Sequence, residues 1–510
     1  MGRMAAARRR AAAAQGEAVI RARASSTYEA ASAARRALGW TAPTLGPNDS
    51  MLGSLISLRD RSRLATRNDG YARGVVEKLT SNLVGVGVQP LSQAADREFR
   101  RELQGLWALW TDESDADGVT DWYGQQELSV RCWIEAGECF LRLRTRRPGD
   151  GLRVSMQIQV LEPELCPHTY NAVAPNGNRI RAGIEFSPVG KRVAYYFYAI
   201  RPGDLQDWDA GDLRRVDADQ VMHLYRVRRA GQIRGEPHLT PALVRLRELD
   251  KFDDATVIRQ QLAAMFVAFL KHPATDSSSV NPLTGEEPET TEGNRPVLGL
   301  QPGIFQELAP GEEVEFSEPP DVISGYADFM RQQFFGVAAA TGVPYEVLTG
   351  DMSRVNDRTV RVILHEFRRW VRMLQHHNLA FQVCRPVWRA WMDRVFLDGV
   401  LPIPTAYMKD PLPWTKVLWM PESWPYLNPV QDVQAQKEAI RAGFTSRSAI
   451  ASERGDDAEV IDAQIADDNT RADGLGLILD SDPRRVSNAG LTQARPAGSE
   501  VPDVEKESAA

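Results

Sequence analysis

The residues that most suggest catalysis or metal binding lie in two short stretches of this 510-residue chain. His365 opens the tripeptide HEF, which is not the HExxH zinc motif. The adjacent His376 and His377 would point about 100° apart on a helix, so we expect no shared metal ion. The acidic stretch DESDADGVTD at 112–121 resembles a calcium loop but lacks the EF-hand spacing and its closing glutamate. Surface or intersubunit histidines and a solvated acidic loop are the simpler interpretations.

Other motifs for enzymatic chemistry are also incomplete. GVGVQP at 85–90 has two spaced glycines, but the third glycine and an immediately following helix are missing, so we interpret it as a strand or bulge. The chain contains no P-loop, so it is not itself an ATP-driven motor. The four cysteines form no CxxC pair and are too few for a disulfide framework, which favours a reducing compartment. We therefore predict a protein that is not an enzyme and needs no metal or cofactor.

The charge of the chain is unevenly distributed. Its formal net charge is −7, but residues 1–40 hold eight arginines against two glutamates, and residues 273–319 hold ten acidic residues against Arg295. A protein built to grip DNA tightly usually carries a basic surface. The totals therefore argue against a dedicated DNA-binding module without excluding weak DNA contact. The longest apolar run, residues 262–270, is too short to span a bilayer.

The elements that would position these residues form two different halves. In the first half, residues 51–83 favour two short helices around an Asn-Asp-Gly turn, and residues 95–110 carry Phe, Leu and Trp at helical spacing. Alternating apolar and polar residues predict strands at 84–90, 137–146, 152–163 and 221–227 and a hairpin over 179–200. The first half is thus predicted to be an α+β body.

Long helices dominate the second half. Residues 240–271 are predicted to form one helix of roughly 48 Å, with Thr240 as its cap and Pro241 at the first helical position. The acidic segment 273–319 follows, with short strand-like stretches. A second helix is predicted over 321–341.

A third helix is predicted from Arg358 to about residue 397, roughly 60 Å long and kinked by Pro386. It holds eight arginines against two acidic residues, which could contact nucleic acid, although a face paired with a neighbouring subunit is the favoured interpretation. One chain would struggle to cover such elongated helices. They form either a helical bundle core or a surface that neighbouring copies bury.

Between the second and third helices lies TGDMSRVNDRTVR at 349–361, a polar, turn-forming stretch without a recognisable catalytic group. Gly350 supplies backbone freedom, and Asn356 or Asp357 can cap the helix that follows. The predicted tip of this loop consists of Asp351, Met352, Ser353 and Arg354.

Five segments of the chain resemble the lambda-type portal proteins of tailed bacteriophages. They are RNDGYARGVVEKLTSNLVGVGVQP (67–90), ELCPH (164–168), TGVPYEVLTGDMSRVNDRTVRVILHEFRRWV (341–371), CRPVWRAWMDRVFLDGVLPIP (384–404) and NPVQDVQAQKEAIRAGFTSRSAIASERGDD (428–457). The resemblance covers about 50–470, and Tyr-Glu-x-Leu-Thr-Gly-Asp is its most specific part. Directly after it, Asp357-Arg358-Thr359 replaces the usual small residues, which alters the chemistry of the loop but not the family.

The resemblance implies a phage portal fold: an α/β wing, long stem and spine helices, a small α/β clip and a helical crown, assembled as a dodecameric ring around a DNA channel. It divides the chain into a flexible basic arm (1–50), wing (51–239), stem helix (240–272), clip (273–319), second stem helix (320–348), tunnel loop (349–357), spine helix with a return to the wing (358–427), crown (428–470) and disordered tail (471–510).

The resemblance also assigns functional residues and partners. The tunnel loop, with Gly350, Asp351, Met352, Ser353, Arg354 and Asn356, would project toward double-stranded viral DNA, and Arg354 is the residue expected to touch phosphate. The clip, represented by Glu286, Glu287, Glu289 and Glu292, would dock the terminase large subunit and later the head-completion or adaptor proteins. Its acids face either the channel or a basic partner. The major capsid and scaffold proteins are further expected partners, with assembly in the bacterial host cytoplasm, a final place at the portal vertex of the virion and no membrane.

Two other functions compete with this interpretation. One is a DNA-binding structural adaptor of a virion that uses the N-terminal arginines. The other is an uncharacterised hydrolase in the α+β half, for which the sequence offers no plausible triad or metal set. Rings with a central hole in electron micrographs are expected only of a portal.

Overall fold

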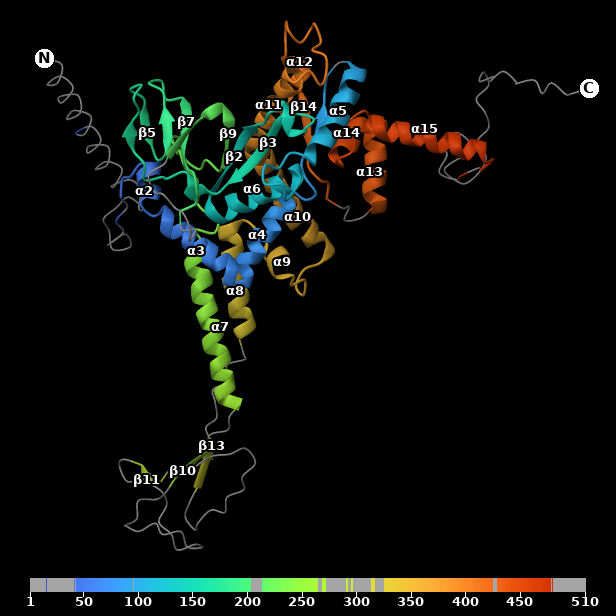
Figure 1. Cartoon of the computed structure of the whole chain (residues 1–510). Helices are drawn as coiled ribbons and strands as arrows, with labels where there is room; N and C mark the ends of the chain where they lie inside the picture. Colours follow the sequence, from blue (N-terminus) through green and yellow to red (C-terminus); the bar gives the residue numbers. More distant parts are fainter. Residues whose placement is uncertain are drawn as a thin grey trace, which may run out of the picture. The chain divides into compact units, whose positions relative to one another are not determined.

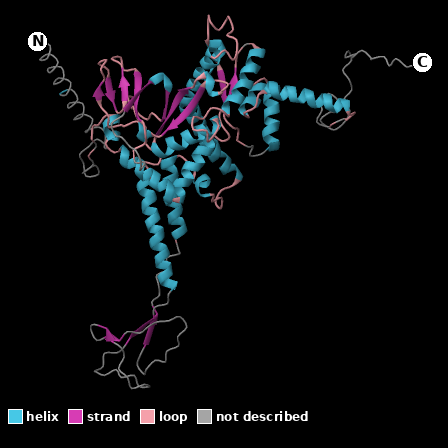
Figure 2. Cartoon of the chain, viewed as in Figure 1, coloured by secondary structure: helices cyan, strands magenta, loops and turns pink. Residues whose placement is uncertain are grey.

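The computed structural model describes residues 43–94, 96–202, 213–264, 325–424 and 429–477, together with isolated short pieces. It is a mixture of helices and antiparallel sheets (Figures 1 and 2). Contacts divide the chain into a smaller unit, 1–54 with 228–233, and a larger unit, 55–227 with 234–510. The predictions for the arm 1–50 and the tail 471–510 fall almost entirely outside the described residues.

The smaller unit is built around helix α2, Pro47–Leu52. The side chain of Asn48 is buried and bonds the segment 228–233 at two points. Its Nδ2 donates to the carbonyl oxygen of Gly231 at 2.9 Å, and the backbone N–H of Ile233 donates to its Oδ1 at 3.0 Å. One amide side chain therefore ties two distant pieces of sequence together.

The larger unit begins with helices α3, Leu55–Asn68, and α4, Gly70–Leu83. Asp69 separates them and accepts hydrogen bonds from the backbone N–H groups of Tyr71 and Ala72, which caps α4. The predicted turn between two helices is confirmed. Helices α5, Arg97–Thr111, and α6, Trp122–Ala136, follow, each capped by an aspartate, and α5 lies close to the predicted position.

Three antiparallel sheets complete the first half. In the first, β2, Glu138–Thr145, lies between β3, Met156–Leu161, and β9, Val221–Tyr225. The second runs in chain order through β4 (Ala172–Val173), β5 (Arg179–Arg181), β6 (Ile184–Phe186), β7 (Arg192–Tyr198) and β8 (Leu213–Asp217). The third pairs β1, Gln89–Ser92, with β14, Val417–Met420. The strands predicted at 137–146, 152–163 and 221–227 and the hairpin over β6 and β7 are confirmed, and the α+β class with them.

The glycines before β1 do not belong to a strand, which corrects the prediction for 84–90. Gly85 and Gly87 have positive φ angles of 58° and 117°, so the chain turns sharply before the strand begins at Gln89. A Cβ atom at Gly87 would lie 2.3 Å from the ring of Tyr123, which explains why glycine is required there.

The helix predicted over 240–271 is shorter than expected at both ends. Helix α7 spans Leu243–Ala264, because the hydroxyl of Thr240 donates to the Pro237 carbonyl instead of capping the helix. At the other end, residues 268–271 form strand β10, which pairs with β13, Glu313–Phe316. This pairing with a segment more than 40 residues away could not be foreseen from local helical spacing. Strand β13 confirms one of the short strand-like stretches predicted within 273–319. In the same segment β11, Thr290–Thr291, pairs with β12, Arg295–Pro296.

Helix α8, Tyr326–Thr341, confirms the second long helix, and a short helix α9, Tyr345–Thr349, follows it. The third long helix consists of α10, Asp357–Leu374, a π-helical segment, Gln375–Cys384, and α11, Arg385–Leu397. Pro386 has no N–H for the helical ladder, and the irregularity predicted there takes the form of these wider turns. Helix α12 spans Leu412–Thr415. Helices α13, Pro429–Arg441, α14, Arg447–Glu453, and α15, Ala458–Gly474, end the described chain.

A cluster of tryptophans joins the third long helix to the first half of the larger unit. The rings of Trp107 and Trp110 of α5 pack against Trp388 and Trp391 of α11 and Trp122 of α6, with centroid separations of 4.9 to 6.4 Å. All five side chains are buried. This aromatic core fixes α11 and, through the π-helical segment, the end of α10. Among the described helices, none is long and apolar enough to cross a membrane.

Candidate functional site

The loop 350–356 is fixed at both ends by local backbone chemistry. Gly350 ends α9 with a φ of 75°, and its N–H bonds the carbonyl of Glu346 at 2.9 Å. Nothing lies within 4 Å of a Cβ added there, so the left-handed conformation, not space, requires glycine. At the other end, Oδ1 of Asn356 accepts from the N–H and the hydroxyl of Thr359 at 2.9 and 3.0 Å. Asn356 is therefore the cap of α10, the first of the two predicted alternatives.

Asp351 is anchored rather than free at the tip of the loop. Its carboxylate accepts from the N–H of Ser353 at 3.0 Å and from the hydroxyl of Tyr345 at 2.8 Å, and Arg331 of α8 lies 3.9 Å away. The hydrogen bonds from Ser353 and then Tyr345 lower the pKa of Asp351 to about 2. The carboxylate thus stays ionised over the whole physiological range and holds the loop against α8 and α9.

Met352, Ser353 and Arg354 are exposed at the tip of the loop. Arg354 pairs with Asp328 of α8 at 2.7 Å, and the two side chains are 61% and 69% exposed. An ion pair as exposed as this is worth about 0.2–1 kcal/mol. Arg354 can therefore exchange Asp328 for another anion at little cost. Whether that anion is a DNA phosphate stays a prediction.

The predicted clip residues Glu286, Glu287, Glu289 and Glu292 lie outside the described residues. Of the two predicted functional sites, the loop therefore lies within the described residues and the clip does not.

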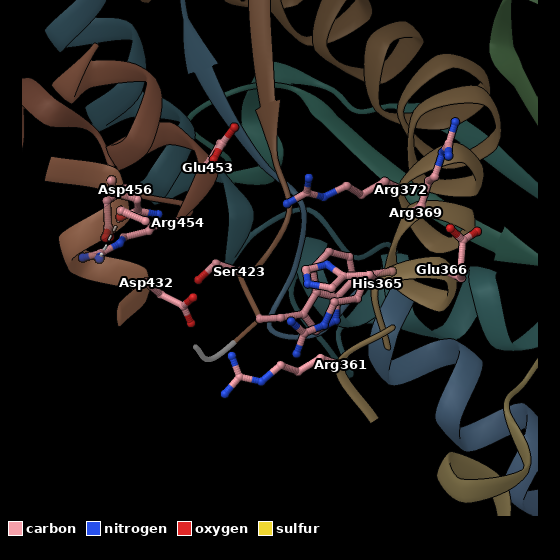
Figure 3. Close-up of a pocket in the computed structure, with 14 residues that line it drawn as sticks. Arg361, His365, Glu366, Arg369, Arg372, Ser423, Asp432, Glu453, Arg454 and Asp456 are labelled. Atoms are coloured by element: carbon pink, nitrogen blue, oxygen red, sulfur yellow. Dashed lines mark hydrogen bonds between the residues drawn. The ribbon is translucent and has the colours of Figure 1, made fainter. Parts of the chain in front are cut away.

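A second site was only partly visible in the sequence: an open groove of about 870 Å³ bounded by α10, α13 and α14. Figure 3 shows basic side chains from α10 on one side and Asp432, Glu453 and Asp456 from the helical end of the chain on the other. Arg361 and Arg372 point across the opening, whereas Arg369 and Glu366 point away from it (Figure 3). The arginine-rich helix was noticed in the sequence, but its opposite wall was not.

Trp424 lines this groove beside Arg368 and Arg372, which define its inner end; the outer end lies at Arg361 and His365. The guanidinium carbons of Arg368 and Arg372 each lie 5.4 Å from the centroid of its ring, and its Nε1 donates to Asn82 Oδ1 at 3.0 Å. Burial, and then the neighbouring charge of Arg372, lower the pKa of Arg368, while Asp432 opposes the shift. Nothing in the local sequence around Trp424 could have assigned it this position.

The first half contains a cluster of buried ionisable groups with shifted pKa values that could be mistaken for a catalytic site. Glu138 accepts from His223 Nε2 at 2.9 Å, from Arg234 Nε at 2.8 Å and from the Gly235 N–H at 2.8 Å, and it also pairs with Arg59. Burial opposes ionisation, but Arg234 and Arg59 hold the pKa of Glu138 well below its usual range. Burial likewise lowers the pKa of His223 to about 4. The side chains are at most 3% exposed, so no substrate reaches them.

The predicted acidic loop has a structural role of its own. The carboxylate of Asp115 accepts from the backbone N–H groups of Asp117, Val119 and Thr120 and from Gln125 Nε2. Its oxygens are used to shape the turn before α6.

Comparison with known proteins identifies the class. The sequence matches the family described as "Phage portal protein, lambda family" over residues 33–375. The chain belongs to this lambda family of phage portal proteins. As a portal protein, it provides the channel through which viral DNA is packaged and ejected. The resemblance drawn from the sequence is confirmed, and portal proteins are structural rather than enzymatic.

Individual relatives are consistent with this assignment. The "Probable portal protein" of Halomonas phage phiHAP-1 is 26% identical over 436 residues, which is 82% of this chain and 81% of that protein. "Portal protein B" of Escherichia phage lambda is 20% identical, covering 89% and 91% of the two chains. Among solved structures, the neck of a native GTA particle computed with C12 symmetry is similar with a TM-score of 0.47 and 15% identity, over 82% of this chain and 97% of the other.

Proposed function

We propose that twelve copies of this chain form a closed ring around the viral DNA at one vertex of the capsid. The observation that carries this proposal is the exposure of large apolar side chains on the long helices. Val244, Val257 and Ile258 of α7 are 74%, 54% and 55% exposed, and Phe329 of α8 is 45% exposed. Apolar surface repeated along a helix pair is typical of an interface. Neighbouring subunits would bury it.

The elements receive roles within this ring. The first half forms the wing, α7 and α8 the stem, the segment 273–319 the clip, the run from α10 to α11 the spine, and α13 to α15 the crown. The loop 350–356 is the tunnel loop and faces the DNA. Arg354 then exchanges its contact with Asp328 for a phosphate in passing. A charge-assisted contact contributes about 1.5–3 kcal/mol at best, so contacts made a few at a time retain DNA without locking it.

The proposal includes the partners of the ring. The clip would dock the terminase large subunit during packaging and the head-completion or adaptor proteins afterwards, with Glu286, Glu287, Glu289 and Glu292 among the contacting residues. The ring would form in the host cytoplasm with the scaffold and major capsid proteins. The support is the negative charge of the segment, ten acidic residues against Arg295.

Electron microscopy of the purified chain, combined with analytical ultracentrifugation, tests the assembly. We expect rings with a central hole and a sedimentation coefficient that shows no monomer at micromolar concentration. A stable, compact monomer under these conditions would refute the proposal. A DNA-binding adaptor would bind DNA as a monomer or dimer and would give no hole.

A further inference from the structure

The basic wall of the groove defined above is continuous along one face of α10. Arg361, His365, Arg368 and Arg372 follow at spacings of four, three and four residues, which places them on the same side of the helix. The inner end of this face is already satisfied, because Arg368 and Arg372 stack on Trp424. At the outer end, Arg361 pairs with Asp357 of its own helix at 3.0 Å, and His365 is exposed.

Helix α13, which bounds the groove, and helix α15, which follows α14 in the chain, are poorly covered. Neither α13 nor α15 contains a buried residue, although both carry apolar side chains. Val430 and Phe444 are 80% and 86% exposed, and Val460 and Ile465 of α15 are 52% and 44% exposed. Helices of 13 to 17 residues gain most of their stability from packing. These side chains lie outside the lining of the groove, but α13 bounds it. A protein in the groove can extend over the apolar side of α13, whereas a DNA backbone would leave it in water.

Helix α15 is acidic and so has the charge opposite to that of the basic wall on α10. It carries five acidic residues and one arginine. Glu459 and Asp462, in its first turns, pair with Arg100 of α5 at 2.6 Å and Arg447 of α14 at 2.5 Å. These pairs fix the start of α15, and its distal half runs away from α14 (Figure 1). Asp467 and Asp468 lie in that distal half, where the partner of Asp468 is the exposed Arg471 of the next turn.

We propose that the groove between α10, α13 and α14 receives the distal half of α15, residues 465–474, from a second copy of this chain. Asp467 and Asp468 of the incoming helix lie against Arg361 and His365, and Ile465 covers apolar surface beside them. A chain does not fill its own groove in this way, because Glu459 and Asp462 fix the start of its α15 and the distal half runs away from α14, which bounds the groove (Figure 1). Each subunit thus gives one helix and receives one, a head-to-tail contact that closes only in a ring.

This inference rests on the ring assembly proposed above, and the tests separate the two. The charge-reversed variants Asp467→Arg/Asp468→Arg and Arg361→Glu change exposed or half-buried side chains and should leave the subunit folded. We expect each to raise the concentration needed for half-maximal assembly about tenfold, because opposite charges become like charges. Combining all three substitutions should restore assembly. The matched control, Glu98→Arg/Glu102→Arg on α5, reverses two exposed acids outside the groove and should assemble normally.

Cysteine cross-linking tests the contact directly. The double variant Arg361→Cys/Asp467→Cys should give a ladder of covalent multimers on a non-reducing gel, and neither single variant should. If wild-type chains form rings but the double variant stays monomeric on the gel and charge reversal has no effect, the inference fails while the ring stands. If wild-type chains form no rings, the proposed function fails first.

Nucleic acid is the competing occupant. Should Arg361→Glu leave assembly unchanged and instead weaken the binding of a labelled DNA duplex to assembled rings, the groove is a DNA site and the intersubunit proposal is overturned. We expect the reverse: unchanged duplex binding per assembled ring, and weaker assembly.

Discussion

Single buried charges determine how the first half of the larger unit holds together. Glu138, at the start of β2, is shared by Arg59 of α3, His223 of β9 and Arg234 of the chain that follows β9. The ELCPH motif surrounds this cluster: Glu164 binds Arg63 with two hydrogen bonds, and the carbonyl of Cys166 accepts from Arg234 at 3.0 Å. The motif that carries part of the family resemblance therefore has a structural task, because removing one partner of a buried charge costs about 3–5 kcal/mol.

His223 makes the stability of this cluster dependent on pH. Burial lowers the pKa of His223 to about 4 from 6.5. Between these values the unfolded chain binds a proton that the folded chain does not, so this stabilisation is complete above pH 6.5 and is lost as the pH falls toward 4. His223→Gln, which can still donate to Glu138, should lose about 2 kcal/mol less than the wild type between pH 7 and pH 5.

Urea unfolding at fixed protein concentration, at pH 7 and pH 5, measures this difference. His377→Gln changes an exposed histidine and is the matched control, with the pH dependence of the wild type. Identical pH dependence of all three proteins would show that His223 does not titrate on unfolding in this range.

At the scale of elements, local chemistry predicted the start of α10 but not that of α7, where Thr240 does not act as the cap. Asn356, one of the two predicted alternatives, caps α10, and Asp69 caps α4 within the predicted Asn-Asp-Gly turn. The predicted end of α7 was wrong because residues 268–271 pair with β13, and this long-range pairing cannot be seen in the local sequence. The loop shows both cases. Gly350 and Asn356 were predictable, whereas the pair between Arg354 and Asp328 joins residues 26 positions apart and depends on how α8 packs.

The construction of the loop predicts what its removal does. Deleting 351–354 removes the anchored Asp351 and the exposed tip but leaves both flanking helices and the Asn356 cap. We expect rings to assemble and DNA to enter normally, while packaged genomes are held less well. A packaging assay scored for full-length, retained genomes measures this.

The matched control for this deletion is Asp328→Ala, which frees Arg354 without removing it and should retain DNA at least as well as the wild type. Wild-type retention in the deletion variant would refute the role assigned to the loop. Failure to form rings would show instead that the loop is structural.

At the scale of the whole molecule, the sequence predicted helices that one subunit cannot cover, and the structure exposes apolar side chains along α7, α8, α13 and α15. The groove beside α10 was beyond prediction. Its basic face is periodic in sequence, but Trp424 and Asp432 lie more than fifty residues away from it and come close only through the fold. The spacing of the arginines therefore predicts the basic face of α10, but only the tertiary fold determines which residues lie opposite it.

The distribution of charge over the whole chain predicts how the assembled ring meets its partners. With ten acidic residues against Arg295 over 273–319, partner association should be partly electrostatic and slow down as salt rises. Replacing Glu286, Glu287, Glu289 and Glu292 by glutamine should weaken binding of terminase or adaptor proteins and leave rings intact. Neutralising four exposed acids elsewhere (Asp60, Glu98, Glu102 and Asp219) is the matched control and should change neither. Association rates measured by surface plasmon resonance on assembled rings decide the point, because equal rates for all three proteins, unaffected by salt, would show that the charge of this segment is incidental.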